Sequence, residues 1–81
     1  MIVNVRYGKD LITVDLRVSQ IRYLHNVDRQ GLIEFIPLSH DDVWGYESLF
    51  ESDKNLFLKS LVEDVYSNLG IRLVKKNLKF V

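Results

Sequence analysis

Four carboxylates in the middle of the sequence could do chemistry together. Asp41 and Asp42 are adjacent, and Glu47 and Glu51 follow with the four-residue spacing that places two side chains on one face of a helix. Such a group could chelate a hard cation or supply an acid/base pair, but clustered carboxylates on a helix are more commonly a solvated face. They could also dock against a basic groove of another protein, and we interpret them as such a docking surface.

Large aromatic residues lie among these acids. Trp44 and Tyr46 flank Gly45, and Phe50 and Phe57 follow. Aromatic side chains beside charges are typical of interface anchors, and they are equally typical of the core of a small domain. We predict that Phe50 and Phe57 belong to the core. We predict that Trp44 and Tyr46 are exposed and contact the partner.

The other residues with chemical potential match no catalytic or metal-binding pattern. His25 and His40 are the two histidines, each near an aspartate, whereas a protein metal site needs three or four converging ligands. No serine lies in a glycine-flanked nucleophile elbow, and the isolated glycines form no phosphate-binding loop. Cysteine is absent, which excludes thiolate chemistry. We therefore expect no catalytic residue, no metal ion and no cofactor, and we expect that the protein is not an enzyme.

The C-terminal end of the sequence is basic. No acidic residue follows Asp64, and the tail carries four basic residues beside Phe80: Arg72, Lys75, Lys76 and Lys79. These could contact the phosphates of a nucleic acid. Alternatively, the tail strand neutralises the acidic segment of the same monomer. The formal net charge of zero argues against a protein whose main role is to grip phosphates.

Length and composition favour one soluble domain. With 81 residues, 47% of them hydrophobic, the chain can form one domain and is too short for two. The N-terminus has no signal-peptide pattern, and no apolar run reaches the roughly 20 residues of a membrane span. Together with the absence of cysteine, this predicts a cytoplasmic protein without membrane association. Because so small a core leaves little stability to spare, a homodimer stays an option.

Alternating apolar residues predict the strands. Residues 2–7 and 11–18 form a hairpin with a turn at Gly8–Asp10. Residues 19–27 fit either a short helix or a third strand that a turn at 28–31 connects to the next, and we favour the strand. Residues 32–36 are almost continuously apolar, which is typical of a central strand buried on both faces.

The second half of the chain predicts helices and a last strand. Pro37 requires the preceding strand to end or to lie at an edge. Ser39 and the following acids begin a helix that Gly45 shortens to about one irregular turn. Ser52 begins a long amphipathic helix that Gly70 ends, and residues 71–81 form a strand with a bulge at 75–77.

These elements predict an α+β fold over residues 1–81. An antiparallel sheet of four to five strands packs against one long helix in the C-terminal half, with a short second helix as an option. Both ends of the chain are strands, so we expect either one to be an exposed edge.

The expected function is a small protein-binding module. We expect an inhibitor or adaptor that presents the acidic, aromatic-bearing segment to a basic protein surface. By analogy alone, its profile is that of small phage or mobile-element proteins that act on host proteins. The alternative is a dimeric nucleic-acid-binding or transcription-accessory protein that uses the basic C-terminal strand.

Overall fold

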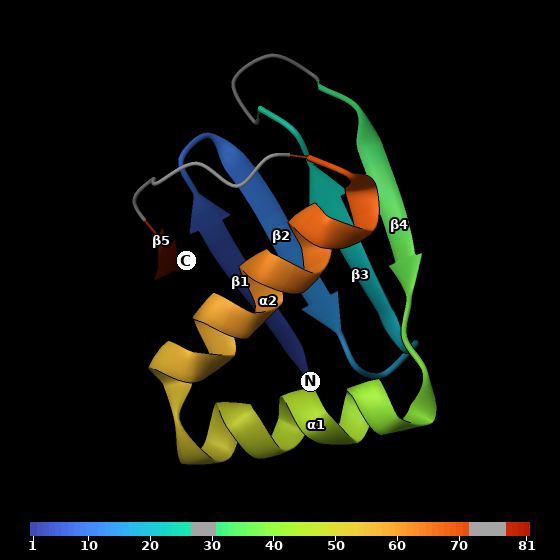
Figure 1. The fold of residues 1–81 in the computed structure, drawn as a ribbon, viewed down its shortest axis with the longest axis vertical. Helices are drawn as coiled ribbons and strands as arrows, with labels where there is room; N and C mark the ends of the chain where they lie inside the picture. The colour runs from blue at the N-terminus through green and yellow to red at the C-terminus, as the bar shows by residue number, and fades with distance from the viewer. Residues whose placement is uncertain (27–30, 72–77) are drawn as a thin grey trace.

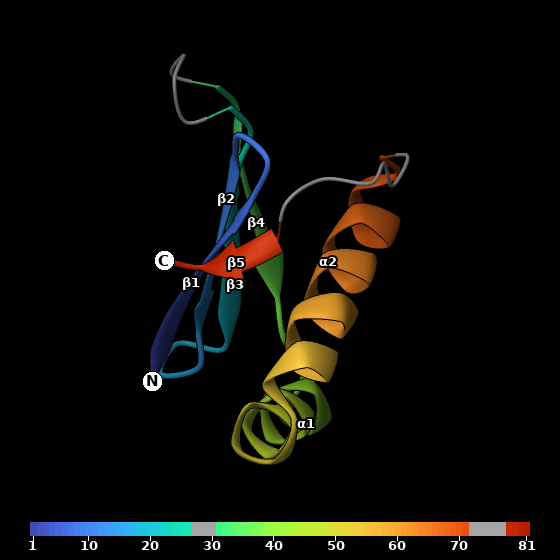
Figure 2. The same cartoon turned by 90° about the vertical axis from the view of Figure 1, so that its left-hand side faces the viewer.

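A five-stranded antiparallel sheet packed against two helices makes up the fold, so the predicted α+β class is confirmed. The computed structural model describes residues 1–26, 31–71 and 78–81. In space the strands follow the order β4-β3-β2-β1-β5, and both helices lie on the same side of the sheet (Figures 1 and 2). The elements are β1 (Ile2–Tyr7), β2 (Asp10–Asp15), β3 (Gln20–Leu24), β4 (Ile33–Pro37), α1 (His40–Ser52), α2 (Lys54–Leu69) and β5 (Leu78–Phe80).

The first hairpin follows the alternation in the sequence. Val3 and Val5 of β1 lie opposite Val14 and Ile12 of β2, and all four side chains are buried beneath the helices. Gly8 has a φ of 63°, which glycine adopts without strain, and this allows the tight turn. The second strand ends at Asp15, earlier than predicted, and leaves Val18 exposed.

Residues 20–24 form a strand, as the favoured interpretation of this segment predicted. Ile21 and Tyr23 of β3 are buried, and the strand pairs with β2 on one side and β4 on the other. The predicted turn at residues 28–31 lies outside the described residues except for Gly31.

The prediction of a central strand at residues 32–36 was wrong. The strand β4 lies at the edge of the sheet, and Ile36 is its buried side chain. A run of apolar residues does not show whether a second sheet neighbour or a second layer exists. The edge position agrees with the constraint set by Pro37, which cannot donate a backbone hydrogen bond.

Two full helices replace the predicted long helix and irregular turn. The helix α1 begins as predicted, with a reciprocal capping box between Ser39 and Asp42, but it continues through Gly45 for 13 residues. The helix α2 has 16 residues; Asp53 caps its start, one residue after the predicted Ser52, and Gly70 ends it in the left-handed conformation. No helix in the described ranges is long and apolar enough to cross a membrane.

The C-terminal strand pairs with the N-terminal strand. Residues 78–80 bond to β1, so of the two terminal strands that were candidates for an exposed edge, β1 is an inner strand. The C-terminal strand β5 does form an edge. Its Phe80 ring lies 6.1 Å from Phe50 and 6.2 Å from Phe57, which ties the strand to both helices. The predicted bulge at 75–77 lies outside the described residues.

Candidate functional site

The acids predicted as a docking surface are exposed on α1. Asp41, Asp42, Glu47 and Glu51 all reach solvent, and the helix contains no lysine or arginine. The neighbouring helix adds two further exposed carboxylates to this side of the molecule. We call the following residues the acidic helical surface: Asp41, Asp42, Trp44, Glu47, Glu51, Glu63 and Asp64.

The two aromatic residues predicted to be exposed have opposite environments. Trp44 is 72% exposed, as predicted, whereas Tyr46 is 6% exposed, so that part of the prediction was wrong. Residues two positions apart point to nearly opposite sides of a helix, and Tyr46 is on the side that faces α2. Its ring packs 5.8 Å from Phe57, and its hydroxyl donates a 2.6 Å hydrogen bond to Asp64. Burial raises the pKa of Tyr46, and the Asp64 carboxylate raises it further.

A hollow of about 280 Å³ lies between the two helices. Asp41, Asp42, Glu63 and Asp64 contribute to its walls, and Tyr46 is among the other lining residues. A second hollow of about 320 Å³ shares Asp42, Tyr46 and Asp64 and extends to β4. Glu63 and Asp64 were not among the predicted site residues because the sequence does not show that α2 folds back beside α1.

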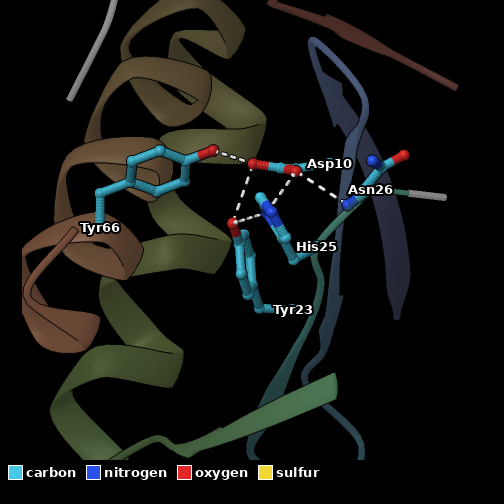
Figure 3. A network of polar contacts seen from close by, with 5 residues as sticks. All are labelled: Asp10, Tyr23, His25, Asn26 and Tyr66. Carbon is cyan, nitrogen blue, oxygen red and sulfur yellow. Dashed lines mark hydrogen bonds and ion pairs between the residues drawn. The ribbon is translucent and has the colours of Figure 1, made fainter. Parts of the chain in front are cut away.

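The structure also contains a buried polar network that the sequence did not reveal (Figure 3). Asp10, predicted as a turn residue, is the first residue of β2 and is 2% exposed. The hydroxyls of Tyr23 and Tyr66 both donate to its Oδ2, the former at 2.8 Å. The backbone N–H of Asn26 donates to its Oδ1 at 3.0 Å, and Nδ1 of His25 lies 3.1 Å from the same oxygen.

Burial and the Asp10 carboxylate keep the hydroxyls of Tyr23 and Tyr66 protonated. Burial, with the hydrogen bond to Asp10, raises the pKa of Tyr23 to about 12. The same two causes raise the pKa of Tyr66. Both hydroxyls therefore act as donors at neutral pH. Because Tyr66 belongs to α2 whereas Asp10 and Tyr23 belong to the sheet, the network fastens the helix to the strands beneath it.

The two histidines lie in different parts of the structure. His25 borders the network with an exposed side chain, and its Nδ1 also lies 3.3 Å from the Tyr23 hydroxyl. His40 is exposed at the first turn of α1. Neither residue lines the hollow between the helices or the one beside β4. Within residues 1–26, 31–71 and 78–81, no group of three or more His, Cys, Asp or Glu residues is arranged to hold a metal ion.

The sheet face opposite the helices has a different character. No described element covers it (Figure 2). Strand alternation places Arg6, Arg22 and Phe35 on it because the adjacent Val5, Ile21 and Ile36 are buried on the helix side. A hollow of about 370 Å³ on this face includes Arg22 and Phe35 in its lining. Asp15, on the same face, is paired with Arg17 at 3.2 Å, and the hydrogen bond from Arg17 lowers the pKa of Asp15.

Of the four predicted basic tail residues, the structure describes Lys79. It lies opposite Arg6 in the β1–β5 pairing and is exposed. Since the adjacent Phe80 packs on the helix side, Lys79 points to the uncovered sheet face. Lys79 therefore adds a positive charge to the sheet face that carries Arg6 and Arg22, and it does not neutralise the acidic helices. Arg72, Lys75 and Lys76 lie outside the described residues.

Comparison with known proteins gave no match: no family model, no curated protein and no solved structure is significantly similar to this chain.

Proposed function

We propose that this protein is a non-enzymatic binding module, an inhibitor or adaptor, whose acidic helical surface docks against a basic surface of a partner protein. The observation that carries the proposal is the exposure of Trp44. Its side chain is 72% exposed on a helix with four carboxylates and no lysine or arginine.

The physical argument combines an apolar anchor with a surrounding charge. Tryptophan is among the residues that contribute most to binding when a partner's pocket covers them. Glu47 and Glu51 lie three and seven residues after Trp44, on the same face of the helix. Carboxylates around an anchor favour encounter with a basic surface and disfavour acidic ones. The hollow between the helices, with Asp41 and Asp64 in its wall, offers a place for a lysine or arginine side chain of that partner.

Capture from the native cell lysate, followed by titration of the purified partner, tests this proposal. We expect Trp44→Ala to weaken the partner's affinity at least tenfold, which is about 1.4 kcal/mol. A triple charge reversal of Asp41, Glu47 and Glu51 to lysine should slow association and remove its salt dependence.

The matched control reverses a charge elsewhere. Glu34 of β4 is exposed and does not belong to the acidic helical surface, so Glu34→Lys should leave the partner's affinity and its salt dependence unchanged. A partner that binds the Trp44→Ala and charge-reversed proteins as tightly as the wild type would contradict the proposal.

Nucleic-acid binding by the uncovered sheet face is the second candidate. Arg22 lies directly opposite Phe35 in the β3–β4 pairing, and Arg6 and Lys79 lie on the same face. Exposed aromatic rings beside cations on a sheet are the arrangement on which single-stranded bases stack.

Fluorescence anisotropy of a labelled single-stranded oligonucleotide at low salt tests this candidate. Arg22→Ala and Phe35→Ala should each weaken binding, whereas Lys59→Ala, an exposed change on α2, should not. No binding of any oligonucleotide at low salt would reject it.

A further inference from the structure

The edge strand β4 has backbone groups that no described residue uses. Residues 33–37 pair with β3 on one side, and β4 is the last strand in the sheet order. On the side away from β3, the N–H and C=O groups that do not bond to β3 face outward. An edge of this kind is a template for another strand; Pro37 withholds one N–H donor from it, and the other residues of β4 keep theirs.

The pairing with β3 shows which groups face outward. The backbone N–H of His25 donates to the Leu32 carbonyl oxygen at 3.1 Å. The backbone N–H of Leu38 donates to the Ser19 carbonyl oxygen at 2.8 Å. Since hydrogen-bonded pairs alternate along an antiparallel ladder, the even-numbered residues from 32 to 38 bond to β3. Ile33, Phe35 and Pro37 therefore direct their groups outward. Proline occurs at a position where no bond to β3 is lost.

The sequence of this edge can meet an antiparallel copy of itself largely with apolar residues. Residues 32–38 read Leu-Ile-Glu-Phe-Ile-Pro-Leu. Around Phe35 as the centre, Leu32 lies opposite Leu38 and Ile33 opposite Pro37, whereas Glu34 lies opposite Ile36. An antiparallel copy of the same segment would therefore meet it with apolar side chains opposite apolar side chains at most positions.

Several of these side chains are unusually exposed for their type. Leu32 is 77% exposed, Phe35 59% and Ile33 52%. Neighbouring exposed apolar residues on a sheet edge are a feature of surfaces that contact other protein chains.

We propose that two copies of this protein pair through β4, antiparallel, about a two-fold axis at Phe35, so that their sheets join into one. In this register each Phe35 N–H donates to the Phe35 carbonyl of the other copy. Each Ile33 N–H donates to the other copy's Pro37 carbonyl. Both outward-facing N–H groups of β4 thus gain acceptors, and the exposed Leu32 of each copy comes to lie beside Leu38 of the other.

Charge disfavours one neighbouring register and presents no barrier to a second copy as the occupant. An axis at Glu34 would place that residue directly opposite its own copy, and like charges in that position are destabilising. The zero net charge of each chain removes long-range repulsion between two copies. The interface shares no residue with the acidic helical surface, although the hollow of about 320 Å³ adjoins both, so variants at Phe35 and at Trp44 test the dimer and the docking function separately.

Single cysteines test the register directly, because the chain has no cysteine of its own. A hydrogen-bonded antiparallel pair has Cα atoms about 5.5 Å apart, within the range that a disulfide spans. Phe35→Cys should therefore cross-link to a dimer under mild oxidation at least tenfold faster than Leu56→Cys. Leu56 is a suitable control because it is 45% exposed and belongs to α2, not to the sheet. Equal rates for the two variants, or fastest cross-linking by Glu34→Cys, would overturn the proposal.

Sedimentation of charged variants gives a second, independent test. Phe35→Lys and Phe35→Glu should each sediment as a 9.5 kDa monomer, and an equimolar mixture should sediment as a species of twice that mass. Circular dichroism confirms that each variant is folded. The wild type should convert from monomer to dimer as its concentration rises. A wild type that stays monomeric up to about 1 mM, or a mixture that does not associate, would overturn the proposal.

Discussion

The hydroxyl of Tyr23 donates a 2.8 Å hydrogen bond to Oδ2 of Asp10, a carboxylate that is 2% exposed at the start of β2. The hydroxyl of Tyr66, from α2, donates to the same oxygen. The rings of Tyr23 and Tyr66 meet edge to face at 5.8 Å. One carboxylate therefore joins the sheet to the helix layer. A buried carboxylate is costly unless such donors surround it, so these residues depend on one another.

Replacing Asp10 by asparagine should destabilise the fold despite the similar shape. Both carboxylate oxygens accept from donors: Oδ2 from the two tyrosines and Oδ1 from the Asn26 N–H. In asparagine an NH2 group replaces one of these oxygens. That group is a hydrogen-bond donor, so it would face the O–H or N–H groups that now donate to the carboxylate. We expect Asp10→Asn to lower the free energy of unfolding by roughly 1–3 kcal/mol in urea denaturation.

Asp15→Asn is the matched control, because Asp15 is the other aspartate of β2. Its carboxylate is bound by Arg17 at the surface, where ion pairs contribute little to stability. We expect this variant to unfold at nearly the urea concentration of the wild type. If the two asparagine variants were equally stable, the Asp10 network would not be a stabilising element.

Stability should fall in alkaline solution as tyrosines ionise. The unfolded chain loses a tyrosine proton near pH 10, whereas burial and Asp10 raise the pKa of Tyr23 in the folded protein to about 12. Above about pH 10 the unfolded state thus binds fewer protons than the folded state. The contribution of Tyr23 is complete below about pH 10 and is lost as the pH rises towards 12. Tyr66 and Tyr46, whose pKa values are also raised, act in the same direction.

Urea denaturation at a series of alkaline pH values measures this dependence. Tyr23→Phe removes one of the titrating groups, so its free energy of unfolding should decline less steeply with pH than that of the wild type. Parallel curves for the two proteins would show that Tyr23 ionises alike in the folded and unfolded states.

Features that depend on local sequence were the predictable ones. The alternation of Val3 and Val5 defined the first strand, and Ser39 and Gly70 marked helix ends, because pleat, cap and left-handed turn are set by neighbouring residues. The helix α1 is longer than predicted. The low helix propensity of Gly45 costs little beside the packing of Tyr46 against Phe57, so the helix continues through the glycine.

Features that depend on contacts between distant residues were not predictable from the sequence. Asp10 contacts Tyr66, 56 positions later, and no local pattern indicates that pair. The burial of Tyr46 and the hollow lined by Asp64 both require α2 to fold back on α1. The edge position of β4 likewise depends on the order of strands in the sheet. The exposed acids were predictable because charged side chains are seldom buried in a small core.

The two glycines in or next to the helices should respond in opposite ways to alanine. Gly45 is inside α1, and a Cβ atom there would meet no heavy atom within 4 Å, so Gly45→Ala should stabilise the protein by about 1 kcal/mol. Gly70 has a φ of 70° at the end of α2, where alanine is strained, so Gly70→Ala should destabilise it by about 1 kcal/mol.

Urea denaturation of both single variants and the double variant checks this pair. Because the sites are separate, their effects should add, and the double variant should be close to the wild type in stability. A destabilised Gly45→Ala variant would contradict the continuous helix at this position.

Trp44 is the chain's single tryptophan, so its fluorescence reports on the acidic helical surface alone. In the free protein its 72% exposure predicts red-shifted, water-like emission that a neutral quencher such as acrylamide reaches freely. Binding of a partner through this surface should shift the emission to the blue and protect it from the quencher, since docking removes the indole from water. Dimerisation through β4 leaves Trp44 exposed, so raising the concentration of the protein alone should not shift the emission. A blue shift on concentration would place Trp44 in the contact between copies, and partner binding without any shift would place the docking site elsewhere.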